Sequence, residues 1–176
     1  LRGLAAVALG LALGSAGAFA DPPRLVIDAG SDLSSAPGSS PRQLTTVGER
    51  VVFTAVDESD VEHLWTSDGT LDGTYAVGPS CAPRVYGENW RRLGSVPGAV
   101  LFAFTCDGTG TAIWRTDGTV AGTFAIHDYG PETDWIPAAP HANGLLYLGD
   151  SLCNVDGCER LNLWWSDGTA EGTRQV

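Results

Sequence analysis

Short apolar segments recur along this chain, each separated from the next by glycine-rich or polar turns. Three of them, residues 51–53, 100–102 and 145–148, are almost unbroken runs of apolar side chains. Such a short unbroken run is typical of a strand that is buried on both faces. The flanking segments are also short and lack helix signals. The pattern therefore predicts an all-β fold of short antiparallel strands.

The apolar runs belong to units of about 50 residues, which cover residues 41–78, 90–127 and 135–176. In the first unit we expect strands at residues 43–47, 51–56, 63–66 and 74–77. In the second we expect them at residues 92–96, 99–104, 112–115 and 123–126. The third unit carries five additional residues between its apolar run and its tryptophan, in the stretch that contains Cys153 and Cys158. Each unit is thus expected to form one four-stranded sheet.

A tryptophan followed by an Asp-Gly-Thr turn and a second Gly-Thr pair closes every unit. Its positions are Trp65, Asp68, Gly69, Thr70, Gly73 and Thr74; Trp114, Asp117, Gly118, Thr119, Gly122 and Thr123; and Trp164, Asp167, Gly168, Thr169, Gly172 and Thr173. Aspartate and glycine suit a two-residue hairpin turn, in which the carboxylate accepts backbone N–H groups. The second glycine is expected to allow another tight bend, and the tryptophan to pack on the adjacent unit. We interpret the motif as structural.

Four antiparallel strands per repeat make up one blade of a β-propeller, so the chain is expected to form three blades of a propeller-like array. Propellers close with about four to eight blades, and three therefore imply an incomplete ring. We expect the chain to be the N-terminal part of a longer protein, with residues 24–28 as an orphan outer strand. The alternative is that three-blade chains assemble with one another.

At the closing motif the chain resembles the bacterial ELWxxDGT repeat proteins. The matching segments read His-Leu-Trp-Thr-Ser-Asp-Gly-Thr from residue 63, Ala-Ile-Trp-Arg-Thr-Asp-Gly-Thr from residue 112, and Asn-Leu-Trp-Trp-Ser-Asp-Gly-Thr from residue 162. The leading glutamate of the family is replaced in all three copies, by His63, Ala112 and Asn162. The resemblance implies an exported, propeller-like repeat protein, and it implies no catalytic activity.

The first 20 residues have the features of a secretory signal peptide: Arg2, an apolar run over residues 4–13, and an Ala-Phe-Ala cleavage pattern at residues 18–20. We expect residues 21–176 to be the mature domain and to be secreted, periplasmic or at the cell surface. The whole chain has a net charge of −11 and contains no lysine. This acidity argues against nucleic acids and anionic membranes as partners.

Four cysteines in an exported chain favour disulfides. Cys153 and Cys158 flank an Asp-Gly turn and are expected to pair with each other, which leaves Cys81 to pair with Cys106. Three connectivities are formally open to four cysteines. A zinc site is the alternative, but the chain has no Cys-x-x-Cys spacing.

Candidate catalytic and metal-binding residues are few. His63, His127 and His141 share no ligand spacing, and there is no Gly-x-Ser-x-Gly nucleophile elbow. We therefore predict no catalytic residue, no metal site and no cofactor. Calcium is the one alternative that we keep open, because oxygen ligands crowd a single loop. These are Asp150, Asn154, Asp156 and Glu159.

The function that these observations favour is a non-enzymatic exported scaffold that binds protein or glycan ligands. Aromatic and arginine side chains in a loop outside the repeated motif suit such contacts. They are Tyr86, Trp90, Arg91 and Arg92. For Trp90, packing between two blades is an equally good interpretation. One alternative is the N-terminal fragment of an extracellular hydrolase or lyase that degrades polymers. Another is a calcium-stabilised surface or adhesion module.

Overall fold

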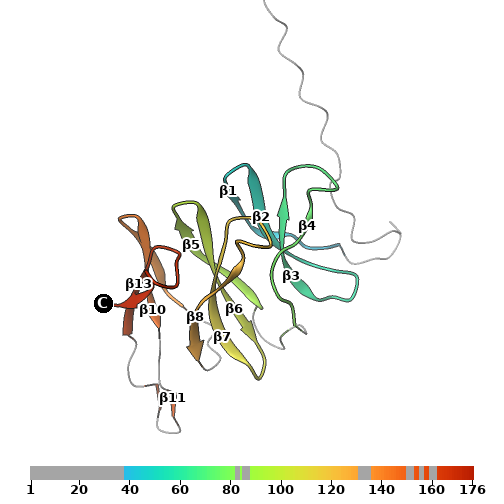
Figure 1. The fold of residues 1–176 in the computed structure, drawn as a ribbon. Coiled ribbons are helices and arrows are strands. Elements are labelled where there is room, and N and C mark those ends of the chain that lie inside the picture. The colour runs from blue at the N-terminus through green and yellow to red at the C-terminus, as the bar shows by residue number, and fades with distance from the viewer. Residues whose placement is uncertain are drawn as a thin grey trace, which may run out of the picture.

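Three four-stranded antiparallel sheets follow one another along the chain (Figure 1). The structure is a computed structural model that describes residues 38–81, 84, 88–130, 136–149, 153–154, 157–158 and 162–176. Throughout these residues the regular elements are β-strands. The described part of the chain contains no helix long and apolar enough to cross a membrane. The all-β prediction is confirmed.

Within each sheet the strands lie in chain order. The first sheet consists of β1 (Arg42–Val47), β2 (Arg50–Val56), β3 (Glu62–Ser67) and β4 (Tyr75–Ala76). The second consists of β5 (Trp90–Val96), β6 (Ala99–Cys106), β7 (Gly110–Thr116) and β8 (Phe124–Gly130). The third consists of β9 (Ala138–His141), β10 (Gly144–Gly149), β13 (Asn162–Ser166) and β14 (Arg174–Gln175). Each predicted unit thus forms one sheet, with strand limits close to those expected.

The first hairpin of every sheet is closed by a two-residue loop that requires a positive φ. Gly48 (φ 58°) lies in the loop between β1 and β2, and Gly98 (φ 71°) in the loop between β5 and β6. Ala142 (φ 52°) takes this role between β9 and β10. Glycine adopts such a conformation without the steric cost that a Cβ atom brings, which explains the glycine turn predicted in the first two units.

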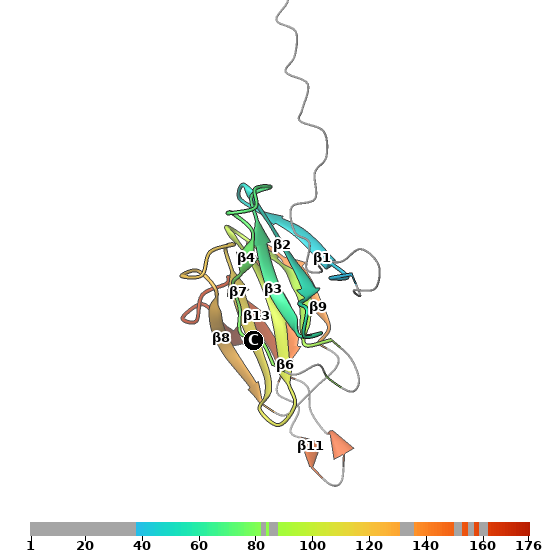
Figure 2. The same cartoon turned by 90° about the vertical axis from the view of Figure 1, so that its right-hand side faces the viewer.

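The additional residues of the third unit form a small hairpin of two strands, β11 (Cys153–Asn154) and β12 (Gly157–Cys158). Its register places Cys153 opposite Cys158. The hairpin projects beyond the end of the third sheet (Figures 1 and 2). The insertion therefore lies where the spacing of the repeats predicted it, while the Cys153–Cys158 disulfide concerns side chains outside the described residues and stays a prediction.

The sheets stack face to face, and a separate apolar core fills each of the two interfaces. Between the first and second sheets, Val52 and Leu64 pack with Trp90, Val100 and Phe102. The core between the second and third sheets is a cluster of buried residues. It contains Val96, Ala99, Leu101, Ala103, Ile113, Ile126, Tyr129, Ile136, Leu145 and Tyr147. The middle sheet therefore contributes one face to each core.

We expected the second strand of every unit to be buried on both faces. In β6, Val100 faces the first sheet and Leu101 the third, and both are fully buried. In β2 four consecutive residues, 52–55, are buried as well, and only the ends of the strand, such as Val51, are half-buried. The prediction is wrong for β10, where Leu146 and Leu148 are half-buried, because no sheet of the described residues covers their face. The described residues form three stacked sheets and do not close a ring.

Candidate functional site

The Asp-Gly-Thr motif forms the connection between the third and fourth strands of each sheet. These connections cover residues 68–74, 117–123 and 167–173. They are therefore longer than the two-residue hairpin turn that the sequence suggested, and that expectation was wrong. The aspartates do not adopt a positive φ, whereas Gly69, Gly118 and Gly168 do, at 89°, 86° and 92°. Only the glycine of each pair thus has the conformation predicted for both residues.

One carboxylate oxygen organises each connection. Oδ1 of Asp117 accepts hydrogen bonds from the backbone N–H (2.9 Å) and hydroxyl (2.7 Å) of Thr119. The Thr119 hydroxyl oxygen accepts from Gly122 N (3.0 Å), and the Thr123 hydroxyl donates to Thr119 O (2.6 Å). The same four bonds occur in the first and third repeats. The motif thus forms the same hydrogen-bonded turn in all three repeats.

A serine or threonine directly before each aspartate completes the hydrogen bonds of the turn. This role was not predicted from the sequence. The hydroxyl oxygen of Thr116 accepts from Gly118 N (3.0 Å) and bonds the Thr123 hydroxyl (2.7 Å). Ser67 and Ser166 have the same two partners in their own repeats. The available signal was that this position is serine or threonine in all three copies.

The second glycine of the motif is required for space, not for a bend. Gly73, Gly122 and Gly172 are not among the residues with positive φ. A Cβ atom on Gly122 would lie 2.0 Å from Asp117 Oδ2, and one on Gly172 would lie 2.1 Å from Asp167 Oδ1. The aspartate therefore rests directly on the glycine backbone, and any larger residue displaces it.

The hydrogen bonds favour the charged form of each aspartate. The Thr70 side-chain hydroxyl lowers the pKa of Asp68 below its ordinary value of 3.8, and the Thr169 hydroxyl does the same for Asp167. Burial acts to raise the pKa of Asp117, but the bonds from Thr119 outweigh it, and this pKa is also lowered. The carboxylates are already engaged by their own turns, so they need no metal ion to hold them.

Two of the three motif tryptophans pack into the interfaces between sheets, and Trp65 lies on the outer face of the first sheet. Trp114 packs against the core between the first and second sheets, and Trp164 against the next core. Trp164 also lies over the His127 ring, with 4.1 Å between centroids. The Trp65 indole N–H donates to Ala55 O at 3.2 Å, whereas those of Trp114 and Trp164 are buried and have no hydrogen-bond partner in the described structure. The expected indole acceptor is therefore present in one repeat of three.

Of the four predicted contact residues, Trp90 is the clearest correction. Its side chain is fully buried between the first two sheets, where it packs on Phe104 (4.5 Å between centroids) and Trp114 (5.9 Å). It cannot contact a ligand, because its large apolar ring is needed to fill the core. Arg91 is half-buried, Arg92 is exposed and bonds Ser95 Oγ (3.1 Å), and Tyr86 lies outside the described residues.

A polar hollow of about 240 Å³ lies close to this buried tryptophan. It is lined mainly by residues of the first sheet and of the segment that leads into β5. These are Gly38, Ser40, Arg42, Ala55, Val56, Asp60, Glu62, Arg84, Glu88 and Asn89. No sequence pattern indicated this hollow, because its residues come from separate segments that only the stacking of two sheets brings together.

Hydrogen bonds and ion pairs fix the wall of the hollow. Glu62 Oε2 accepts from the backbone N–H groups of Asn89 (2.8 Å) and Trp90 (3.2 Å). Arg42 Nη1 lies 3.3 Å from Glu88 Oε1, and both residues line the hollow. Asp60 and Arg42 are exposed. The hollow therefore has a polar wall that hydrogen bonds hold in place. The charged side chains at its rim are exposed to solvent.

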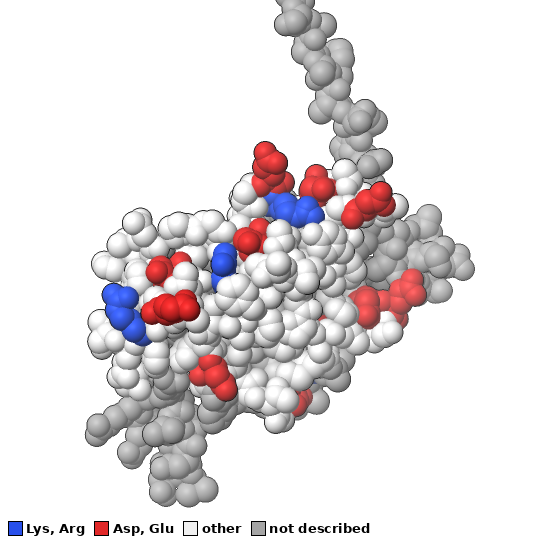
Figure 3. Space-filling view, viewed as in Figure 1, with Lys and Arg blue, Asp and Glu red and all other residues white. Residues whose placement is uncertain are grey.

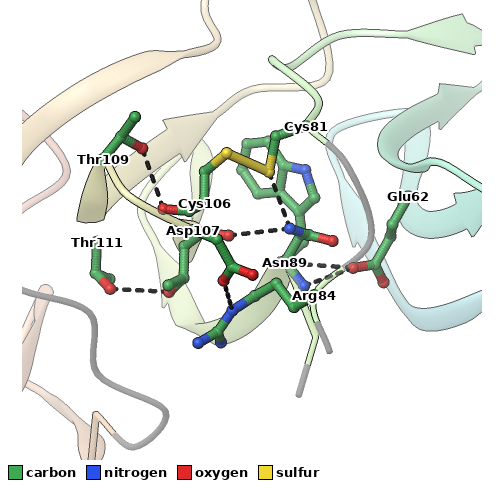
Figure 4. The surroundings of a disulfide bond; sticks show 10 residues. Glu62, Cys81, Arg84, Asn89, Cys106, Asp107, Thr109 and Thr111 are labelled. Carbon is green, nitrogen blue, oxygen red and sulfur yellow. Dashed lines mark hydrogen bonds and ion pairs between the residues drawn. A yellow bond between two sulfur atoms is a disulfide. The ribbon is translucent and has the colours of Figure 1, made fainter. Parts of the chain in front are cut away.

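A disulfide between Cys81 and Cys106 holds the segment next to the hollow (Figure 4). It agrees with the pairing that the sequence suggested and joins the segment after β4 to the end of β6. Asn89 Nδ2 donates to Cys81 Sγ (3.0 Å) and to Thr105 O (3.1 Å), and Arg84 Nε donates to Asp107 Oδ1 (3.1 Å). The same cross-link thus connects the first two sheets and positions two residues that line the hollow.

Two of the three histidines have side-chain partners, and His141 is exposed. His63 Nε2 lies 2.9 Å from Asp57 Oδ2, and His127 Nδ1 lies 2.9 Å from the Tyr147 hydroxyl. Among the described residues there is no group of three or more histidine, cysteine, aspartate or glutamate side chains able to hold a metal ion. The candidate calcium loop of Asp150, Asn154, Asp156 and Glu159 lies where the structure describes no side chains, so it stays a prediction.

Asp and Glu are spread over the face shown in Figure 3 and do not gather around one point. Comparison with known proteins adds no assignment: no family model, no curated protein and no solved structure matches the chain.

Proposed function

We propose that this chain is a non-enzymatic, exported binding scaffold built from propeller-like blades, and that its polar hollow binds a glycan. The observation that carries the proposal is the hollow itself, where Arg42, Asp60 and Glu88 lie around a fixed polar wall. Carboxylates accept hydrogen bonds and guanidinium groups donate them, so together they match the hydroxyl groups of a sugar.

The size and chemistry of the hollow favour a sugar over a protein side chain. Its volume of about 240 Å³ is below the range of roughly 300–1,000 Å³ that is usual for pockets of drug-sized ligands. A single terminal sugar unit is therefore the size of ligand that we propose. Protein contacts instead depend on buried aromatic and arginine anchors, and Trp90, the predicted aromatic anchor, is occupied in the core.

Export is supported by the signal-like residues 1–20 and by the Cys81–Cys106 disulfide, which is typical of an oxidising environment. The resemblance to ELWxxDGT repeat proteins supports the same location. The hydrolase or lyase alternative and the calcium-stabilised module stay predictions, since no described residue pair or loop favours either.

A glycan array probed with the purified chain tests the proposal. We expect retention of a limited set of glycans, and a loss of affinity of about tenfold or more in Asp60→Asn, because asparagine tolerates the positive φ of Asp60 (61°) but removes the charge. The matched control is Asp72→Asn, an exposed acid of the first motif turn away from the hollow. The absence of any bound glycan, or equal losses in both variants, would overturn the proposal.

A further inference from the structure

The first and third sheets each have one outer face. The outer face of the third sheet resembles one side of the two internal interfaces, and the outer face of the first sheet resembles the other side. We call the outer face of the third sheet, formed by Leu146, Leu148 and Leu163, the leucine face. We call the outer face of the first sheet, formed by Val51, Phe53 and Trp65, the aromatic face. The pairing of β10 with β13 and of β2 with β3 defines which side chains share each face.

The leucine face matches the faces that the first two sheets bury against the next sheet. In the strand registers Leu163 takes the position of Leu64 in the first sheet and Ile113 in the second. Leu64 and Ile113 are completely buried at 0% exposure, whereas Leu163 is 40% exposed. A shallow, mainly apolar hollow of about 280 Å³ opens over Leu146, Leu148 and Leu163. This face is therefore built like an interface, and no sheet formed by the described residues covers it.

The aromatic face matches the faces that the second and third sheets bury against the preceding sheet. Val51 takes the register position of Val100 and Leu145, which are both 0% exposed, but Val51 itself is only half-buried. Phe53 of the same face is buried at 7% exposure. Trp65 takes the position of Trp114 and Trp164, and all three are half-buried, but Trp114 and Trp164 pack against the two cores between sheets and Trp65 belongs to neither.

The motif turns give independent evidence that no described sheet precedes the first one. A Cβ atom on Gly118 would meet Arg50 and Thr66 of the first sheet, and one on Gly168 would meet Val96 and Leu101 of the second. Each of these turns thus rests on the preceding sheet. At Gly69 a Cβ atom would meet nothing within 4 Å, and this glycine is exposed.

We infer that the leucine face of one copy of this chain packs on the aromatic face of a second copy, in the geometry of the two internal interfaces. Such a head-to-tail contact joins unlike surfaces and gives either a closed ring or an open filament. Two copies of the three described sheets give a ring of six, which lies within the roughly four to eight blades of known propellers. Nine described sheets from three copies would exceed that range, so the assembly expected of residues 1–176 is a closed dimer. This inference rests on the proposed blade arrangement and is independent of the glycan.

Sedimentation equilibrium of the chain tests the inference, because it measures mass without any ligand. We expect the mass of a dimer, and at least a tenfold weaker association in Leu163→Glu and in Val51→Glu, each of which places a charge in one of the two faces. Leu71→Glu and Val120→Glu are the matched controls, because Leu71 and Val120 are 68% and 62% exposed in the motif turns. Both controls should remain dimeric.

Mixing the two face variants distinguishes a head-to-tail contact from a symmetrical one. Each variant retains the face that the other has lost, so a mixed pair has one interface without an introduced charge. An equimolar mixture should therefore form a one-to-one dimer more tightly than either variant associates alone. Circular dichroism before mixing establishes that both variants are folded, and Leu163→Glu alone tests the leucine face should Val51→Glu fail to fold. A wild-type chain that remains monomeric at all concentrations, or a mixture of folded variants that does not associate, would overturn the inference.

Discussion

Asp117 and Gly122 depend on each other, because the Asp117 carboxylate lies directly over the Gly122 backbone. We expect Asp117→Ala to lower the free energy of unfolding by about 1–3 kcal/mol, since it removes the charged acceptor of two Thr119 donors. Gly122→Ala should displace the same carboxylate and lose the same bonds. The double variant should therefore be clearly less destabilised than the sum of the single variants. Urea denaturation measures all three, and additive losses would show that the glycine has another role.

The motif aspartates also predict how stability depends on pH. Their pKa values in the folded state lie below the ordinary value of 3.8. The stabilisation is therefore fully present above about pH 4 and is lost as the pH falls through the folded-state pKa values. We expect the free energy of unfolding to decrease below pH 4, and to decrease less steeply in Asp167→Asn. A series of thermal melts between pH 2 and pH 6 checks this, and identical slopes for variant and wild type would argue against it.

Among the larger elements, the Cys81–Cys106 cross-link joins two segments that are 25 residues apart in sequence. Closing a loop of that length restricts the unfolded chain and corresponds to roughly 3–4 kcal/mol in the loop-entropy model. We expect the Cys81→Ser/Cys106→Ser variant to lose stability of that order in chemical denaturation without reducing agent. Because the segment that it holds lines the polar hollow, glycan binding should weaken as well. Unchanged stability would mean that the disulfide constrains little of the unfolded chain.

The strands were predictable from the sequence, because each apolar run is bounded by turn residues with an unambiguous backbone preference. Residues 51–53 and Gly48 define β2 and its hairpin in this way. The sequence left two roles open for Trp90, a ligand contact or packing between blades. This residue lies next to arginines and outside the repeated motif, and only the stacking of two sheets shows that its ring fills a core. The length of the motif turns was also missed, because Asp-Gly alone suggests a shorter hairpin than the hydroxyl bonds around it produce.

For the molecule as a whole, the number of sheets followed from the repeat, but their contacts did not. Arg50 shows why: its Nε donates to Gly118 O of the second sheet (3.2 Å), and its Nη1 lies 3.6 Å from Asp68 Oδ2 of the first. The corresponding β10 residue, Gly144, has no side chain, so no repeat pattern indicated this link. The polar hollow and the two outer faces likewise depend on which sheet surfaces meet.

The stacking of sheets through the motif tryptophan is the central claim, and a double-mutant cycle between Leu64 and Trp114 tests it most directly. The two residues belong to different sheets and to the same core. We expect Trp114→Ala alone to cost about 3–5 kcal/mol. The double variant with Leu64→Ala should depart from additivity by at least about 0.5 kcal/mol, whereas Trp114→Ala with Leu163→Ala, on the opposite outer face, should be additive. Additive losses for Leu64 and Trp114 would contradict the stacked arrangement.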